Sequence, residues 1–221
     1  MSRRAVTLLV LCILVVLLSL VSMAAGRVWV PFGLWTDPGD PRWAIIFELR
    51  LPRTILAIAV GAALGMSGAA MQGYTRNPLA DPGALGVSSM GALGAVLTLY
   101  LGAGASEPWV IAAAAMTGAL AAVLLLLALS GQASSIVTFI LAGVILQTMA
   151  GAGVALALSL APNPWAVNEI VNWLMGSLAD RSLGEVQLAL PLIVAGGVLL
   201  LSIGRGLDAL TLGETGARSL G

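Results

Sequence analysis

The sequence predicts an all-α, polytopic membrane protein with about six transmembrane helices. Of its 221 residues, 59% are hydrophobic and only 9% are charged, and the mean hydropathy is +1.03. Soluble domains carry about 25% charged residues, so lipid must solvate much of this chain. Backbone polar groups in lipid must be satisfied internally, and the alternating pattern of barrel strands is absent, so the spans are expected to be helices.

Apolar runs without charge recur along the chain. A spanning helix needs about 20 such residues. The stretch from Pro108 to Asn168 carries no charge and is too long for one helix, and it breaks at Ser130-Gly131-Gln132. The predicted spans are Ala5–Ala25, Thr54–Tyr74, Ala84–Ala105, Pro108–Leu129, Ala133–Leu160 and Val186–Ile203.

The first run also resembles a signal peptide, because Arg3 and Arg4 precede it. However, the uncharged run from Ala5 to Gly26 exceeds the about 7–15 apolar residues of a signal-peptide core. We interpret it as a retained helix, with cleavage as the alternative. Between the last two spans, the apolar stretch Ile170–Leu178 is too short to cross and predicts an interfacial or re-entrant helix.

The second span carries small residues at helical spacing: Ala57, Gly61, Gly65 and Gly68. They share one face, which favours close helix packing in lipid. In the turn that follows, Pro78 and Pro82 prevent a continuous helix. We expect Asp81 to cap the third helix and to pair with Arg76.

Several functions are disfavoured by composition. The chain has no lysine, so it lacks the phosphate-binding loop of nucleotide hydrolases. It has no histidine and one cysteine, which argues against a Cys/His metal site, and we expect no cofactor. The zero net charge gives no sign of nucleic-acid binding.

Five stretches carry a family resemblance. They are LRLPR (residues 49–53), GAALGMSGAAMQ (61–72), RNPLADPGALGVSSMGALGA (76–95), WLMGSL (173–178) and LTLGETGARSLG (210–221). In this order and spacing they resemble the FecCD-type permeases, the membrane subunits of ATP-binding-cassette (ABC) importers for ferric siderophores, haem and cobalamin.

The resemblance implies a fold and a function. Family members typically have about ten helices in two halves, so residues 1–221 would form a C-terminally incomplete permease domain that resembles the first six. The expected function is a permease subunit, in the plasma (inner) membrane of a prokaryote, that passes iron–siderophore or related chelates into the cytoplasm. Its expected partners are a separate ATPase subunit, an extracytoplasmic binding protein, a second permease copy and the lipid bilayer.

The sequence also bears on two other classes of membrane protein, proteases and secondary transporters or channels. Membrane-embedded proteases need histidine or paired aspartates within spans, and this chain offers neither, so we predict that it is not an enzyme. A secondary transporter or channel for another small solute stays as the alternative. Such proteins usually place ionisable residues inside the membrane, and the predicted spans lack acidic and basic residues.

Candidate site residues follow from the resemblance and from position. Arg50 and Arg53 are expected at the outer face to help dock the binding protein, because arginine binds carboxylates bidentately; interfacial anchoring is the alternative. The predicted translocation path comprises Met66, Gln72, Gln147 and Gly151, for which helix packing is the alternative. The predicted gate comprises Trp173, Gly176 and Ser177, for which a static interfacial helix is the alternative.

The segment 207–221 is predicted to begin the cytoplasmic contact with the ATPase. It combines apolar side chains, charges and glycines that permit a sharp turn. The alternative is a solvated loop in which Glu214 and Arg218 pair at helical spacing. The residues assigned to coupling are Leu207, Leu210, Gly213, Glu214, Arg218 and Leu220.

Overall fold

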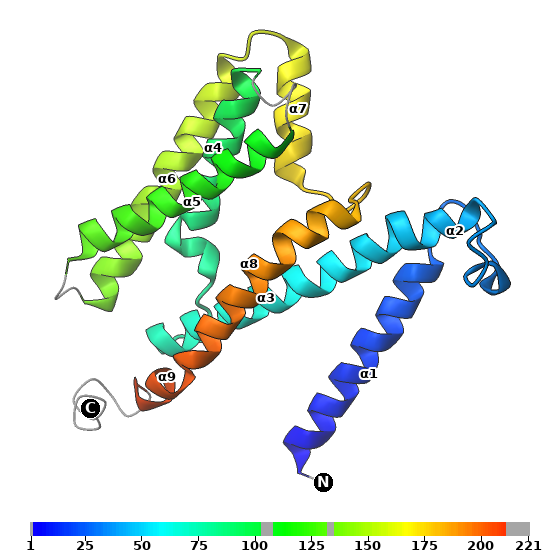
Figure 1. The fold of residues 1–221 in the computed structure, drawn as a ribbon. Helices are drawn as coiled ribbons and strands as arrows, with labels where there is room; N and C mark the ends of the chain where they lie inside the picture. The colour runs from blue at the N-terminus through cyan, green and yellow to red at the C-terminus, as the bar shows by residue number, and fades with distance from the viewer. Residues whose placement is uncertain (1, 103–107, 132–134, 211–221) are drawn as a thin grey trace. The chain divides into compact units, whose positions relative to one another are not determined.

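The computed structural model describes residues 2–102, 108–131 and 135–210, and this part of the chain is helical with no strand (Figure 1). Five of its helices are long and apolar enough to cross a membrane. They are Arg3–Ala24, Arg42–Thr75, Trp109–Ser130, Ile136–Ser159 and Leu183–Ala209. The chain is therefore an all-α polytopic membrane protein, as predicted.

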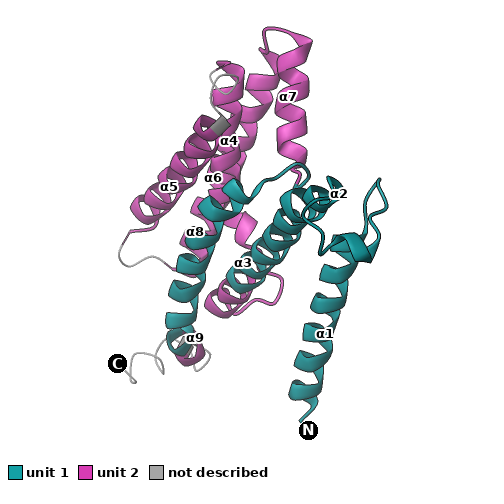
Figure 2. Ribbon diagram, turned by 45° about the vertical axis from the view of Figure 1, so that its right-hand side comes forward, with its two compact units in different colours: residues 1–67, 178–206 teal, residues 68–177, 207–221 magenta. Residues whose placement is uncertain are grey.

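The chain divides into two compact units, coloured separately in Figure 2. Unit 1 comprises residues 1–67 and 178–206, and unit 2 comprises residues 68–177 and 207–221. The boundary at residues 67 and 68 falls within one long helix, α3 (Leu51–Thr75).

Unit 1 begins with α1 (Arg3–Ala24), which confirms the first predicted span. The Ser2 side chain caps this helix by accepting from the Ala5 N–H, and none of its residues is buried. A loop with a short 3₁₀ turn, η1 (Phe32–Leu34), leads to α2 (Arg42–Ala44). The unit also contains the first part of α3 and all of α8 (Leu183–Ser202). The methyl of Met66 in α3 lies 2.9 Å from the position that a Cβ on Gly197 of α8 would occupy.

The second span begins earlier than predicted. A π-helical segment, η2 (Ile45–Arg50), joins α2 to α3 without a break, and the Leu51 N–H bonds to the Ile46 carbonyl. Pro52 has no N–H, and its ring would clash with the carbonyl four residues back in a regular helix. A wider turn immediately before the proline relieves that clash, so the helix passes through Pro52.

Unit 2 is built around α4 (Val87–Tyr100), which contacts α5 (Pro108–Ser130), α6 (Ile136–Ser159) and α7 (Pro164–Met175). Two apolar clusters form its core. One cluster comprises Val96, Leu99, Ala157 and Ile170, and the other comprises Ala122, Leu126, Ala142 and Leu146.

Small residues let the helices of unit 2 approach until their backbones touch. A Cβ at Gly94 would lie 3.0 Å from the Ala114 carbonyl carbon, and one at Gly143 would lie 2.7 Å from the Ala84 oxygen. Any side chain at these positions would force α4 away from α5, or α6 away from the segment before α4. Glycine is therefore a packing requirement here.

The third predicted span, Ala84–Ala105, is wrong in its bounds. The α-helix begins at Val87 because a 3₁₀ turn, η3 (Pro82–Leu85), and Gly86 with φ of 72° precede it. At 14 residues, α4 is about 21 Å long, less than the about 30 Å hydrocarbon core. Asp81 caps η3 by accepting from the Gly83 N–H at 2.6 Å. The described residues show no ion pair between Asp81 and Arg76.

The remaining predicted helices are present with shifted ends. The short apolar segment near Ile170 is helical, but α7 begins at Pro164 with Asn163 as its cap and ends before Gly176. The fourth, fifth and sixth spans correspond to α5, α6 and α8. A capping box at Ser182 and Glu185 starts α8 three residues before the predicted position.

Candidate functional site

Arg50 lies in η2, at the junction of α1 and α3. Its guanidinium donates to the carbonyls of Met23 at 3.0 Å, Ala24 at 2.8 Å and Val28. The last carbonyls of a helix have no partner in the helix and carry partial negative charge, so a cation is favourable there. Arg50 is only 4% exposed. Its guanidinium therefore joins the end of α1 to the following loop.

Arg53 lies one helical turn further along and is partly exposed. Its Nη2 donates to the Ser22 carbonyl at 2.7 Å and to the Ala25 carbonyl at 3.3 Å. Beside it, the hydroxyls of Ser22 and Thr54 are 2.8 Å apart. The structure thus brings both predicted docking residues to one junction. Their docking role stays a prediction.

Aromatic side chains gather in the loop after this junction. The ring centroid of Phe32 lies 6.1 Å from that of Trp29 and 5.1 Å from that of Trp35. Trp29 is 65% exposed and Phe32 is 64% exposed. The Trp35 indole N–H donates to the Val30 carbonyl at 3.4 Å, which closes the loop on itself.

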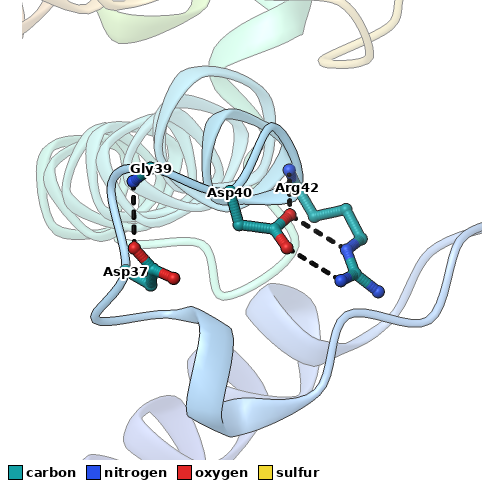
Figure 3. A network of polar contacts seen from close by, with 4 residues as sticks. All are labelled: Asp37, Gly39, Asp40 and Arg42. Carbon is teal, nitrogen blue, oxygen red and sulfur yellow. Dashed lines mark hydrogen bonds and ion pairs between the residues drawn. The ribbon is translucent and has the colours of Figure 1, made fainter.

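A polar turn completes the loop (Figure 3). The Asp37 carboxylate accepts from the Gly39 N–H at 3.0 Å. Asp40 accepts from Arg42 twice through the guanidinium, at 2.8 and 3.0 Å, and once through the backbone N–H at 2.8 Å. The hydrogen bonds from the Arg42 side chain, followed by that from its backbone, lower the pKa of Asp40 to about 2.

The predicted path residues lie on exposed or half-buried surface. Gln147 and Gly151 share one exposed face of α6, whereas Leu146 and Ala150 on the other side are buried. Gln72 is also exposed, near the end of α3. No hydrogen bond joins Gln72 to Gln147 among the described residues. The translocation path therefore stays a prediction.

The predicted gate residues follow α7 to its end. Trp173 is half-buried and packs against the cluster that contains Val96, Leu99 and Ile170. Gly176 ends the helix with φ of 70°, a conformation that other residues rarely adopt. Ser177 is exposed beyond it. A glycine at a helix end is a natural place for a change of direction, but gating itself is a prediction.

The predicted coupling segment is described only at its start. Leu207 lies in α9 (Gly204–Leu210), and its Cβ is 3.8 Å from the position of a Gly73 Cβ near the end of α3. The Leu210 side chain lies outside the described part. Gly213, Glu214, Arg218 and Leu220 also lie outside the described residues.

A groove of about 500 Å³ separates α1 from α3 within unit 1. Most of its lining is apolar, and the Ser22 and Thr54 hydroxyls lie at the end nearest Arg53. Its lining residues are Val15, Leu18, Ser19, Ser22, Thr54, Ala57, Ile58, Gly61 and Ala62.

Comparison with known proteins decides the family. The sequence model of the FecCD transport family matches residues 8–221. The chain belongs to the FecCD transport family. The resemblance in the five sequence stretches is thereby confirmed.

Relatives within the FecCD family include two curated permeases. The chain is 42% identical over 197 residues to the uncharacterized ABC transporter permease protein YvrB of Bacillus subtilis (strain 168), covering 86% of this chain and 55% of YvrB. It is 35% identical over 221 residues to the vitamin B12 import system permease protein BtuC of Salmonella newport (strain SL254), covering 100% of this chain and 67% of BtuC. The chain thus spans just over half to two-thirds of these relatives.

A solved structure shares the fold. It is an ABC transporter of the metal-chelate type in an inward-facing conformation, 30% identical to this chain with a TM-score of 0.85. The match covers 97% of this chain and 67% of that chain. Nearly all of this FecCD chain therefore has a counterpart of known structure.

Sequence reasoning missed two features of the junction in this FecCD chain. A Cβ at Gly26 would lie 2.8 Å from the Arg50 Cζ, so a side chain there would displace the guanidinium. The Ser22–Thr54 hydroxyl contact was also missed. The position of Gly26 directly after the first span was a usable signal for its contact with Arg50. No sequence pattern predicts the contact between Ser22 and Thr54, which are 32 positions apart.

Proposed function

We propose that this chain forms the membrane-spanning permease part of an ABC importer for iron–siderophore or related metal chelates, including haem and cobalamin. The observation that carries the proposal is the FecCD family match over residues 8–221. The substrate class is supported by two relatives, a vitamin B12 permease and a transporter of the metal-chelate type. The importer sits in the plasma membrane of a prokaryote, and a second permease copy completes it.

Energy enters through a separate ATPase subunit in this proposal. The chain has no lysine and so no nucleotide phosphate loop. Residues 207–221 begin the contact with the ATPase. The packing of Leu207 near Gly73 supports this role, because it would transmit movement of the segment to the end of α3.

Substrate arrives from an extracytoplasmic binding protein that docks at Arg50 and Arg53. The released chelate then passes the surface near Met66, Gln72, Gln147 and Gly151, and the segment at Trp173, Gly176 and Ser177 gates its entry. The exposure of Gln147 and Gly151 on one face of α6 supports a path there. The positive φ of Gly176 supports a hinge between α7 and the following segment.

The deciding experiment is transport by the full-length permease, reconstituted in liposomes with its cognate ATPase and binding protein. Uptake of the chelate should require ATP and the binding protein and should be insensitive to ion gradients. Uptake that follows a gradient without ATP would overturn the proposal in favour of a secondary transporter. Calorimetry of the binding protein with a ferric siderophore, haem and cobalamin would then identify the substrate.

A further inference from the structure

The two arginines at the α1–α3 junction differ in whether their guanidinium N–H groups are available to another protein. Arg50 is 4% exposed and directs its guanidinium to three main-chain carbonyls. To reach a carboxylate on another protein, it would have to leave those carbonyls unpaired in a buried place. Arg53 is partly exposed, and in the described part of the chain only its Nη2 has a partner.

The chain from Met23 to Val28 wraps around the Arg50 guanidinium. Its carbonyls at positions 23, 24 and 28 accept the three bonds, and Gly26 lies against the planar group, which a Cβ at that position would displace. Directly after this wrap, Val30 is buried and accepts from the Trp35 indole. Arg50 therefore fixes the path by which the chain leaves α1 and enters the aromatic loop.

We propose that Arg50 is a positioning residue for the docking surface and that Arg53 makes the direct contact with the binding protein. Arg50 shapes residues 23–30, which carry the exposed Trp29 and include Ala25, one of the two residues whose carbonyls accept from Arg53. Nε and Nη1 of Arg53 have no partner among the described residues, and each can donate a charge-assisted hydrogen bond to a carboxylate. This inference rests on the proposed function, because it assumes that a binding protein docks at this junction.

The test uses the full-length permease in lipid nanodiscs and its cognate binding protein. Two quantities are measured for each variant: amide hydrogen exchange of residues 23–30 without the partner, and affinity for the binding protein as a function of salt. Exchange reports loop order and involves no docking. The salt slope reports charges that pair across the interface, which a purely structural role would not move.

Arg53→Ala should weaken binding about tenfold and flatten the salt slope, and it should speed exchange of residues 23–30 much less than Arg50→Ala does. Arg53→Lys keeps the charge and should keep most of the slope. Arg50→Ala should speed exchange of residues 23–30 at least several-fold and weaken binding, with the slope retained. Gly26→Ala keeps both arginines and should behave like Arg50→Ala. The inference can therefore still be tested if Arg50→Ala does not fold.

The inference is overturned if Arg50→Ala flattens the salt slope while exchange of residues 23–30 stays normal, because Arg50 would then contact the partner itself. Normal exchange and binding in Gly26→Ala would also overturn it. If the wild-type permease does not bind the protein at all, the proposed docking fails, and this inference fails with it. A wild type that binds normally confines any failure to the division of roles between Arg50 and Arg53.

Discussion

Two helices with similar small-residue patterns, α3 in unit 1 and α4 in unit 2, pack in opposite ways. In unit 2, α4 and α5 touch through their backbones, with Gly94 against Ala114 and Gly118 against Met90. In unit 1, α1 and α3 are joined at one end by arginine and hydroxyl hydrogen bonds and are otherwise separated by a groove. No described atom outside their own helix lies within 4 Å of where a Cβ would be at Gly61 or Gly65.

The difference lies in the partner helix. The face of α5 that meets α4 carries Ala114, Ala115, Gly118 and Ala119, so both surfaces are small and the backbones meet. The side of α1 that lines the groove toward α3 carries the larger residues Val15 and Leu18. A stripe of small residues permits close packing, but close packing occurs only where the opposing helix is small as well.

The largest loss of stability is expected when the close packing of α4 against α5 is disrupted. Gly94→Leu should lower the free energy of unfolding by about 3 kcal/mol or more, because its side chain would meet the Ala114 backbone. The matched control, Gly61→Leu, projects toward the groove and should change it by about 0.5 kcal/mol at most. Denaturation of the purified full-length protein in detergent measures both. Equal losses would show that the glycines of α3 are packed as tightly as those of α4.

The next largest loss of stability is expected when the arginine hydrogen bonds at the α1–α3 junction are removed. Arg50→Ala should lower the free energy of unfolding by about 2 kcal/mol, because buried carbonyls of Met23, Ala24 and Val28 lose their donor. Arg50→Lys should recover less than half, since an ammonium cannot reproduce a planar fork. The same denaturation assay measures both variants. A full recovery by lysine would mean that charge alone, and not the fork, holds α1 to α3.

Much of the fold was predictable because hydropathy directly reports helices in lipid. The six predicted helices and the short helix near Ile170 are all present. The ends of helices were less predictable, since they depend on local geometry. The αL conformation of Gly86 delays α4, and the π-helical turn before Pro52 extends the second span backwards.

The candidate site was less predictable than the fold. The position of Arg50 and Arg53 at one junction agrees with their common motif, but burial of Arg50 runs against the usual exposure of arginine. It becomes favourable only because α1 ends beside it and offers unpaired carbonyls. That is a tertiary contact between residues more than 20 positions apart, and periodicity along one helix does not report it.

A smaller effect is expected at the start of α8, which carries a local capping box. Ser182→Ala should lower the free energy of unfolding by about 1 kcal/mol, because the Gly184 N–H loses its acceptor. Ser182→Thr keeps the hydroxyl and serves as the control. Thermal unfolding in nanodiscs gives the comparison. A loss as large as that from Gly94→Leu would contradict the view that caps contribute less than backbone packing.

The smallest effect is expected at the Asp40–Arg42 pair, which is partly exposed and lies in the loop of unit 1. The pKa of Asp40 is lowered from 3.8 to about 2, so the pair's contribution to stability is fully present above pH 3.8. It is lost as the pH falls through about 2, because protonation removes the acceptor charge. In Arg42→Gln, the pKa of Asp40, followed by NMR of the full-length protein, should rise toward 3.8. Gly94→Leu should leave this titration unchanged, because the turn is held by its own hydrogen bonds. A pKa that moves with Gly94 and not with Arg42 would show that packing in unit 2 shapes the loop.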